Sequence, residues 1–258
     1  MKNKYITAII LLMISILIVS GCGKEKRNAN EVVLGLDDTF VPMGFKDDQG
    51  KFVGFDIDLA KEVFKRENMK VTFQPIDWSM KETELISGNI DTIWNGYSIT
   101  DERKKKVNFS KAYLSNRQVI ITLANSSIQS KSDLKNQIVG IQEGSSSLEA
   151  VNKEKDLVDS FKDGKPVLYE NNNQALMDLE AKRVDAVVAD ETLARYYMNK
   201  RGESKYKILE DNFGEEDYGI GVRKDDKELL NKINKQIDAM KKDGTYDKIY
   251  QKWFGTLK

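Results

Sequence analysis

The sequence predicts an α/β protein built from two lobes of similar topology. Apolar, strand-like runs alternate with helix-like runs from residue 32 to residue 254. This alternation is typical of mostly parallel sheets covered by helices. The chain also resembles itself, because residues 85–94 align with 179–188 and residues 33–37 align with 138–142. Any two βα units share some similarity, but we interpret the repeated order as one topology used twice.

Each expected element rests on its own local pattern. Short apolar runs bounded by polar residues predict strands at residues 32–36, 70–73, 92–94, 138–141 and 186–188. Longer mixed runs predict helices at residues 56–66, 79–87, 147–152, 174–181, 192–198, 227–242 and 246–254. In the helix over residues 56–66, for example, Ile57, Ala60, Val63 and Phe64 share one face.

The composition excludes several classes of function. The 258 residues are 40% hydrophobic and 32% charged, which is typical of a soluble globular body. Equal numbers of basic and acidic residues, 41 each, argue against a nucleic-acid partner. The absence of His and the single Cys leave few metal ligands, no intrachain disulfide and few catalytic bases. We therefore predict no catalytic residue, no metal and no cofactor.

The first 21 residues have the pattern of a bacterial export signal. Lys2 and Lys4 precede an apolar run over residues 6–19, which is short for a membrane span. The run ends in Val19-Ser20-Gly21-Cys22, which resembles a lipobox, in which the Cys is diacylated after cleavage. We expect a signal peptide at residues 1–21, a lipid on Cys22 and a polar tether over residues 22–30. This places the body outside the cytoplasmic membrane and anchored to it.

Polar residues follow the predicted strands, where open α/β sheets bind ligands. Thr100 is a good N-cap, which places Arg103 in the first turn of a short helix, where the helix dipole disfavours a cation. That conflict favours an anion bound between the helix start and the Arg103 side chain, held by the guanidinium group of Arg103 in a bidentate way and by the Ser98 hydroxyl. The alternative is a surface Arg in a charge-rich stretch.

The second half of the chain supplies matching groups. Ser145 and Ser146 begin a helix and can bind an anion, although Ser146 with Glu149 also satisfies a capping box. Asp190 either caps the following helix or points into the cleft. With the Gly96 carbonyl it could hold a cation, so the set matches a carboxylate beside an ammonium. Phe40 and Trp78 could supply aromatic walls, or pack locally.

At this point the motifs resemble a known family. Residues 40–42 with 50–60, then Gly96-Tyr97-Ser98-Ile99-Thr100-Asp101-Glu102-Arg103, are similar to signatures of the type II periplasmic solute-binding proteins for polar amino acids. Residues 109–113, 139–146, 185–190 and 243–246 continue the likeness over essentially the whole mature body. The sequence departs from the family pattern at Phe40, Met43 and Ala112. None of these positions belongs to the clamp, by which we mean the residues expected to bind the ligand's carboxylate and ammonium groups, so the departures concern only the specificity for the ligand's side chain.

The resemblance implies a ligand site and a role for each of its residues. Arg103 and Ser98 would bind an α-carboxylate, helped by Ser145 and Ser146, while Asp190 and the Gly96 carbonyl would hold the α-ammonium. Phe40 and Trp78 would sandwich the ligand side chain. The pocket around that side chain would be lined by Asp37, Asn95 and Gln142.

The resemblance also implies the architecture and partners. Lobe 1 would comprise residues 31–114 and 218–258, lobe 2 residues 118–211, and hinge crossings residues 115–117 and 212–217. The protein would be the monomeric receptor of an ABC importer, closing on an L-amino acid with a polar or sulfur-containing side chain and docking on the permease. Two alternatives remain: a dehydratase-like enzyme using Asp37, Glu143 or Asp190, and a sensing lipoprotein without a transport role.

Overall fold

The computed structural model describes residues 30–255, of which residues 32–255 belong to one compact unit. The expected signal peptide, the lipidated Cys22 and all of the tether except Asn30 lie outside the described residues. Within residues 30–255, no helix combines the length and the apolar character that a membrane crossing needs.

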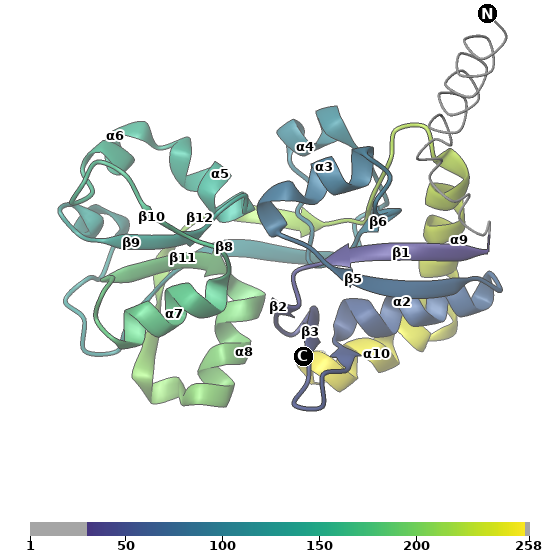
Figure 1. Cartoon of the computed structure of the whole chain (residues 1–258). Coiled ribbons are helices and arrows are strands. Elements are labelled where there is room, and N and C mark those ends of the chain that lie inside the picture. The colour runs from purple at the N-terminus through teal and green to yellow at the C-terminus, as the bar shows by residue number, and fades with distance from the viewer. Residues whose placement is uncertain (1–29, 256–258) are drawn as a thin grey trace, which may run out of the picture. The chain divides into compact units, whose positions relative to one another are not determined.

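The first lobe is built on a five-stranded sheet with the order β5-β1-β6-β13-β7. Its strands are β1 (Glu31–Leu36), β5 (Lys70–Pro75), β6 (Thr92–Ile93), β7 (Asn108–Phe109) and β13 (Gly221–Val222). Its helices are α2 (Phe55–Arg66), α3 (Lys81–Ile86), α4 (Asp101–Lys106), α9 (Lys227–Asp243) and α10 (Thr245–Phe254), with a 3₁₀ turn, η2 (Trp78–Met80). A small sheet of β2 (Thr39–Phe40), β3 (Gly44–Lys46) and β4 (Phe52–Val53) lies beside them. Helices α2, α9 and α10 pack on one another, opposite α3 and α4 in Figure 1.

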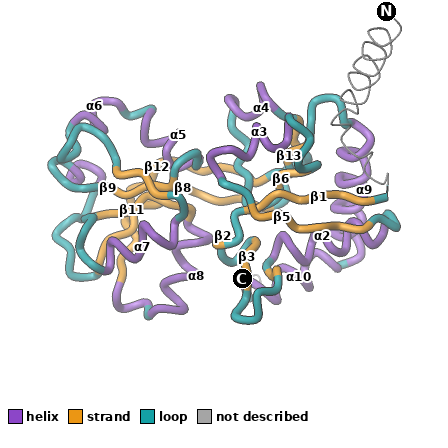
Figure 2. The backbone as a smooth tube through the Cα atoms, viewed as in Figure 1, coloured by secondary structure: helices purple, strands orange, loops and turns teal. Residues whose placement is uncertain are grey.

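The second lobe repeats this plan with a sheet ordered β10-β9-β11-β8-β12. Its strands are β8 (Leu114–Leu123), β9 (Val139–Gln142), β10 (Val167–Tyr169), β11 (Ala186–Asp190) and β12 (Tyr206–Tyr218). Its helices are α5 (Ser146–Asn152), α6 (Lys155–Asp159), α7 (Asn172–Glu180) and α8 (Glu191–Arg201), with 3₁₀ turns η3 (Lys131–Leu134) and η4 (Glu203–Lys205). Figure 2 shows α5 and α6 on one side of this sheet and α7 and α8 on the other.

Two long antiparallel strands connect the lobes. β8 follows the first-lobe strand β7, and β12 precedes the first-lobe strand β13. Near the first lobe they pair Asp217 with Ser115 and Tyr218 with Leu114. The register shifts twice along β12, between Ile208 and Asn212 and between Asn212 and Glu215. Both crossings between the lobes therefore run side by side (Figure 1).

The internal similarity in the sequence corresponds to an equivalent contact in each lobe. Asp91 Oδ2 accepts a hydrogen bond of 2.9 Å from the Val33 amide, and Asp185 Oδ2 accepts one of 2.8 Å from the Ile138 amide. In each lobe the strand after the Asp then pairs in parallel with the strand that contains, or directly follows, the residue supplying this amide, β6 with β1 and β11 with β9. The interpretation of one topology used twice is confirmed by this pairing.

The expectation of mostly parallel sheets was wrong in one respect. β13 is antiparallel to both β6 and β7, and β8 is antiparallel to both β11 and β12. The cause is the double connection, because a chain that leaves a lobe and later returns adds strands to each sheet in the reverse direction. Strands β1, β6, β9, β10 and β11 keep the expected parallel pairing.

Candidate functional site

Arg103 lies where the two lobes meet, and its side chain is only 2% exposed. Its Nη1 donates to the Ser98 carbonyl at 3.1 Å, and its Nη2 donates across the cleft to the Gly144 carbonyl at 3.2 Å. Its Nε donates to Glu149 Oε1 on α5 at 3.1 Å, and the guanidinium lies 4.7 Å from the centre of the Tyr97 ring. All three guanidinium nitrogens therefore have protein oxygens as partners, and an anion could bind Arg103 in a bidentate way only by replacing some of them. The alternative of a surface Arg was wrong.

The start of α4 is capped as the sequence predicted. Thr100 Oγ1 accepts a hydrogen bond of 3.3 Å from the Arg103 amide. The Arg103 side chain turns from this helix into the cleft, while Lys104, Lys105 and Lys106 are exposed. The three Lys side chains stay in water, where the local charge is screened.

Two hydroxyl groups face each other across the cleft. Ser98 Oγ in the first lobe lies 2.8 Å from Ser146 Oγ in the second. Gln118 Nε2 donates to the same Ser146 oxygen at 3.2 Å. Both Ser residues are buried, and the Ser98 carbonyl accepts from Arg103.

The capping residue of α5 differs from the expectation. Ser145, not Ser146, is the N-cap, and its Oγ accepts from the Leu148 amide at 3.1 Å while donating to the Gln142 carbonyl at 2.7 Å. Glu149 forms no capping box and instead binds Arg103. The structure therefore uses the Ser145 hydroxyl to hold the helix start and leaves the Ser146 hydroxyl facing the cleft. The helix expected over residues 79–87 is preceded by a turn that Asp77 caps, because its Oδ1 accepts a hydrogen bond of 2.9 Å from the Ser79 amide.

Asp190 points into the cleft instead of capping α8. It occupies the N-cap position, but its side chain makes no capping hydrogen bond. Its Oδ1 accepts from Asn116 Nδ2 at 2.7 Å, Gln118 Nε2 at 3.0 Å and the Tyr218 hydroxyl at 2.6 Å. Burial, followed by the nearby negative charge of Glu216, raises the Asp190 pKa well above its usual range. A cation bound here would remove much of this electrostatic cost.

Three further predicted residues lie together at another edge of the cleft. Asp37 Oδ2 accepts from Gln142 Nε2 at 2.8 Å, which joins the two lobes. The Asp37 amide donates to Asn95 Oδ1 at 3.0 Å. Burial raises the pKa of the Asp37 carboxyl. The predicted side-chain pocket thus brings together one carboxyl group and two amides, which are also held by Thr39, Gly44 and Asn172.

The two predicted aromatic walls also pack within the first lobe. Phe40 and Trp78 are both buried, and Trp78 makes an edge contact with Tyr97 at 6.0 Å between ring centres. Gly96 adopts φ +58, and a Cβ there would lie 2.6 Å from Phe40 Cε1. A Gly at this position is therefore what allows the Phe40 ring to approach the backbone that carries Ser98. The Gly96 amide donates to Asp56 Oδ2 at 2.7 Å.

Sequence reasoning missed several residues of this region. Lys81 is buried and donates to the Gly144 carbonyl at 2.8 Å, and burial, helped by the charge of Arg103, lowers its pKa to about 8. Asn116 and Gln118 on β8 bind Asp190, and Glu216 on β12 binds Ser98. The period of two along the extended crossings is the signal that could have shown which of these side chains point inward.

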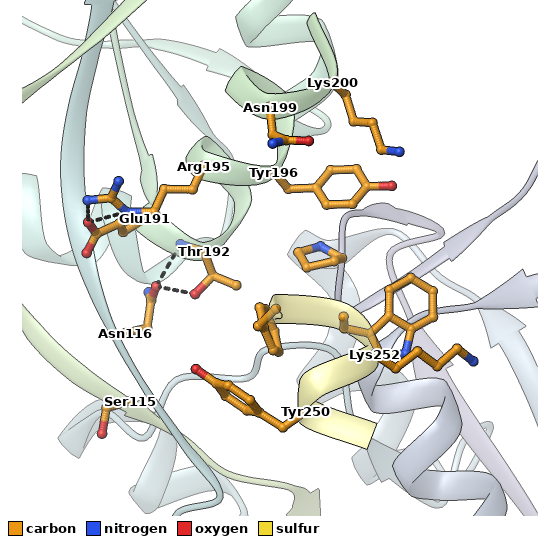
Figure 3. Close-up of a pocket in the computed structure, with 13 residues that line it drawn as sticks. Ser115, Asn116, Glu191, Thr192, Arg195, Tyr196, Asn199, Lys200, Tyr250 and Lys252 are labelled. Atoms are coloured by element: carbon orange, nitrogen blue, oxygen red, sulfur yellow. Dashed lines mark hydrogen bonds and ion pairs between the residues drawn. The ribbon is translucent and has the colours of Figure 1, made fainter. Parts of the chain in front are cut away.

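A separate cavity of about 700 Å³ lies between α8 and the end of α10 (Figure 3). Tyr196, Lys200 and Trp253 are among its lining residues, and none of the predicted site residues lines it. Phe45 packs near it, with ring centres 6.0 Å from Tyr196 in the second lobe and 5.9 Å from Trp253 in the first. This side of the cleft is therefore closed partly by aromatic contact.

Comparison with known proteins shows the family to which the chain belongs. The bacterial extracellular solute-binding proteins, family 3, match residues 32–256. The chain belongs to this family. It is 31% identical over 237 residues to the L-cystine-binding protein TcyJ of Escherichia coli (strain K12), covering 91% of this chain and 86% of that protein.

Solved structures of the family share the two-lobed type II fold. A substrate-binding protein of an ABC uptake transporter from Streptococcus pneumoniae, with bound histidine, matches with a TM-score of 0.84 at 41% identity, over 88% of this chain and 93% of that one. The ancestral amino acid-binding protein AncCDT-1, described as a precursor of cyclohexadienyl dehydratase, matches with a TM-score of 0.79 at 37% identity, over 87% and 96%. Both are described as substrate- or amino-acid-binding proteins.

Proposed function

We propose that this protein is the extracytoplasmic receptor of an ABC importer and that it captures an L-amino acid by closing its two lobes. One observation carries the proposal: a buried guanidinium and a buried carboxyl group lie on opposite sides of one hydrogen-bond chain. Arg103 binds the Ser98 carbonyl, the Ser98 and Ser146 hydroxyls meet at 2.8 Å, and Gln118 links Ser146 to Asp190. A zwitterion offers a carboxylate that can replace the carbonyl partners of Arg103 and a cation for Asp190, which has no ion-pair partner among the described residues.

The ligand would exchange contacts with the residues that now bind each other. Its carboxylate would take the Arg103 fork and the Ser98 and Ser146 hydroxyls, with Ser145 holding the helix start. Its ammonium would bind Asp190 and the Gly96 carbonyl. An α-hydroxy or plain carboxylic acid would leave Asp190 without a cation, and a buried group without its partner is costly.

The ligand's side chain would lie between Phe40 and Trp78 and reach Asp37, Asn95 and Gln142. Amides and a carboxyl group favour a polar side chain, and the two rings suit an apolar or sulfur-containing stem. The hydrogen bond between Asp37 and Gln142 would break when the lobes open. When the lobes close on a ligand, it would either re-form beside the ligand's side chain or be replaced by contacts to that side chain.

Closure would use the paired crossings as a hinge near Ser115–Arg117 and Asn212–Asp217. Lobe 1, residues 31–114 and 218–258, would then move against lobe 2, residues 118–211. A monomer anchored through a lipid on Cys22 would present both lobes to the two halves of a permease. Closure would be favourable because the charged groups of the ligand, once buried, would have binding partners in both lobes.

An enzyme on the same scaffold is the second candidate, and one solved relative is described as a precursor of a dehydratase. Of the three possible acid–base groups, Glu143 is exposed, while Asp37 and Asp190 are buried and hydrogen-bonded. The relatives named for binding support capture without chemistry. Turnover of a bound ligand, followed by chromatography, would favour the enzyme instead.

Thermal melting of the purified protein with each of the twenty amino acids and with cystine tests the proposal. A ligand at 100 times its Kd adds about 2.7 kcal/mol to the free energy of unfolding. We expect a shift with one or a few L-amino acids that is lost in Arg103→Ala and reduced in Arg103→Lys, which keeps the charge but not the fork. Arg183→Ala, at an exposed pair with Asp178, serves as control and should keep the shift. No shift with any of these compounds would remove amino acids as ligands.

A further inference from the structure

Glu216 is the one member of an acidic run on β12 that turns into the cleft. Its neighbours Glu215 and Asp217 are exposed, whereas Glu216 is half-buried. Successive side chains of a strand point to opposite faces, so the crossing itself selects which carboxylate enters. From the sequence alone this run could have been a solvated surface cluster.

The Glu216 carboxylate is bound by donors from both lobes and from the crossing. Its Oε1 accepts from Ser98 Oγ at 2.8 Å, Asn116 Nδ2 at 2.8 Å and Gln118 Nε2 at 2.7 Å. The same two amide nitrogens donate to Asp190 Oδ1, at 2.7 and 3.0 Å. Asp190 and Glu216 therefore share both amide donors and must lie close together.

The charged groups around this pair are engaged elsewhere. Arg103 binds Glu149, and Arg117 binds Glu191, which also binds Arg195. Among the ion pairs of residues 30–255, none includes Asp190 or Glu216. The charged and titratable side chains nearest the pair in the chain or in space include Arg117 on β8, Glu149 on α5, Glu191 and Arg195 on α8, and Glu215, Asp217 and Tyr218 on β12, with Arg103 from the first lobe; α8 also carries Tyr196, Tyr197, Lys200 and Arg201, and β12 also carries Tyr206, Lys207, Glu210 and Asp211.

Two carboxylates held this close, without a cation, resist ionising together. Burial, the charge of Glu216 and a hydrogen bond from Asp190 to Glu216 all favour the protonated form of Asp190. The Tyr218 hydroxyl and the amides stabilise the negative charge that remains on the pair. A coupled pair of this kind takes up its protons as a unit.

We propose that Asp190 and Glu216 hold one proton between them in the empty cleft, and that the ammonium group of the ligand displaces it, so that capture releases a proton. The ligand stays protonated on its nitrogen, the pair goes from one negative charge to two, and the proton passes to water. The proposal rests on the proposed function, because it requires a ligand that carries an ammonium group. Affinity then rises with pH until the pair loses its proton without a ligand.

Calorimetric titration of the full-length protein measures the released proton directly. The probe is the amino acid that gives the largest shift in the melting screen, titrated near pH 7 in two buffers of different ionisation enthalpy. We expect release of up to about one proton per ligand for the natural protein and for the control Glu215→Gln, whose side chain is exposed. In Glu216→Gln the release should be clearly smaller, because Asp190 then ionises at lower pH. Binding without proton release, or equal release in Glu216→Gln, would overturn the proposal while leaving the proposed function intact.

A second measurement does not depend on finding a ligand. Infrared spectra of the empty protein near pH 7 report the carbonyl stretch of protonated carboxyl groups. We expect part of this band to be absent in Asp190→Asn and reduced in Glu216→Gln, and to be unchanged in Glu215→Gln. A band of the same size in Asp190→Asn and the natural protein would show that the pair holds no proton. If no amino acid shifts the melting temperature while this band is present, the proposed function and the release of a proton on ligand binding are both contradicted. Only the proton shared by the empty pair would then be supported.

Discussion

Gly144 is a single residue on which closure of the cleft depends. It has φ +68, and its carbonyl accepts hydrogen bonds from both Arg103 and Lys81 of the opposite lobe. A Cβ at this position would lie 2.9 Å from Ser79 Cα, which is backbone of the first lobe. A side chain would therefore strain the local turn and also hold the lobes apart.

The variant Gly144→Ala separates these two effects when it is compared with Gly164→Ala. Gly164 has φ +67 in the same lobe, but a Cβ there meets nothing within 4 Å. Both variants should lose about 1 kcal/mol of stability from the positive φ. Only Gly144→Ala should also weaken ligand binding, by roughly tenfold or more, since about 1.4 kcal/mol of closure energy corresponds to tenfold. Equal affinities in the two variants, measured by calorimetry, would contradict the role given to Gly144.

Single site residues differed in how far the sequence predicted them. Arg103 was predictable because its position in a helix's first turn conflicts with the dipole, and that conflict is local. The choice for Asp190 between cap and cleft could not be made locally. It depends on Asn116, Gln118 and Tyr218, which lie 74, 72 and 28 residues away.

At the scale of elements, aromatic packing between β3 and α8 helps to join the lobes. Phe45 contacts Tyr196 in the second lobe and Trp253 in the first. Phe52 on β4 is also partly buried, but it packs on Phe73 within the first lobe, with ring centres 5.8 Å apart. The two Phe residues thus form a matched pair, one across the cleft and one within a lobe.

Phe45→Ala should weaken ligand binding, although Phe45 is not one of the residues proposed to contact the ligand. An aromatic pair adds on the order of 1 kcal/mol beyond the buried area, which corresponds to about a fivefold loss of affinity. Phe52→Ala should destabilise the first lobe and leave the affinity unchanged. Titration calorimetry gives the affinities and urea unfolding gives the stabilities. A similar affinity loss in both variants would mean that Phe45 acts only through the stability of its lobe.

Most helices and strands were predictable because their patterns are local. The helices over 56–66, 227–242 and 246–254 were expected within about a residue of α2, α9 and α10. Strand direction was not predictable in the same way, because β8 and β13 run antiparallel only as a result of the double crossing. The 3₁₀ turn η2 before α3 was also missed. Asp77 caps this turn by accepting a hydrogen bond from the Ser79 amide.

For the whole molecule, buried carboxyl groups with raised pKa values, Asp56 and Asp190 among them, make stability depend on pH. Asp56 is completely buried, accepts from the Gly96 amide and the Tyr113 hydroxyl, and has its pKa raised to about 7 by burial. A raised pKa in the folded state means that the unfolded state loses its proton first as pH rises. The contribution of Asp56 to stability is therefore fully present below about pH 4, the range of an unperturbed Asp, and is lost as the pH rises through about 7. Asp190 acts in the same direction in the empty protein.

Asp56→Asn should flatten this dependence. The shift of Asp56 corresponds to at most on the order of 4 kcal/mol between the two limits. Urea unfolding near pH 4.5 and near pH 7.5 should show a smaller difference in Asp56→Asn than in the natural protein. The control Asp48→Asn removes an exposed carboxylate and should leave the difference unchanged. If Asp56→Asn keeps the full difference, the Asp56 carboxyl is not its source.

The sequence by itself determined the lobes, their repeated βα plan and most residues of the proposed clamp. Asp91 and Asp185 show why, because each lies in the same short pattern and makes the same contact with the preceding strand. Only the tertiary structure decided which polar groups meet across the cleft. Glu216 reaches Ser98 over 118 residues, and Arg103 reaches Glu149 over 46. Local patterns follow from the backbone period of a few residues, whereas these pairings depend on how two lobes and their twin crossings come together in space.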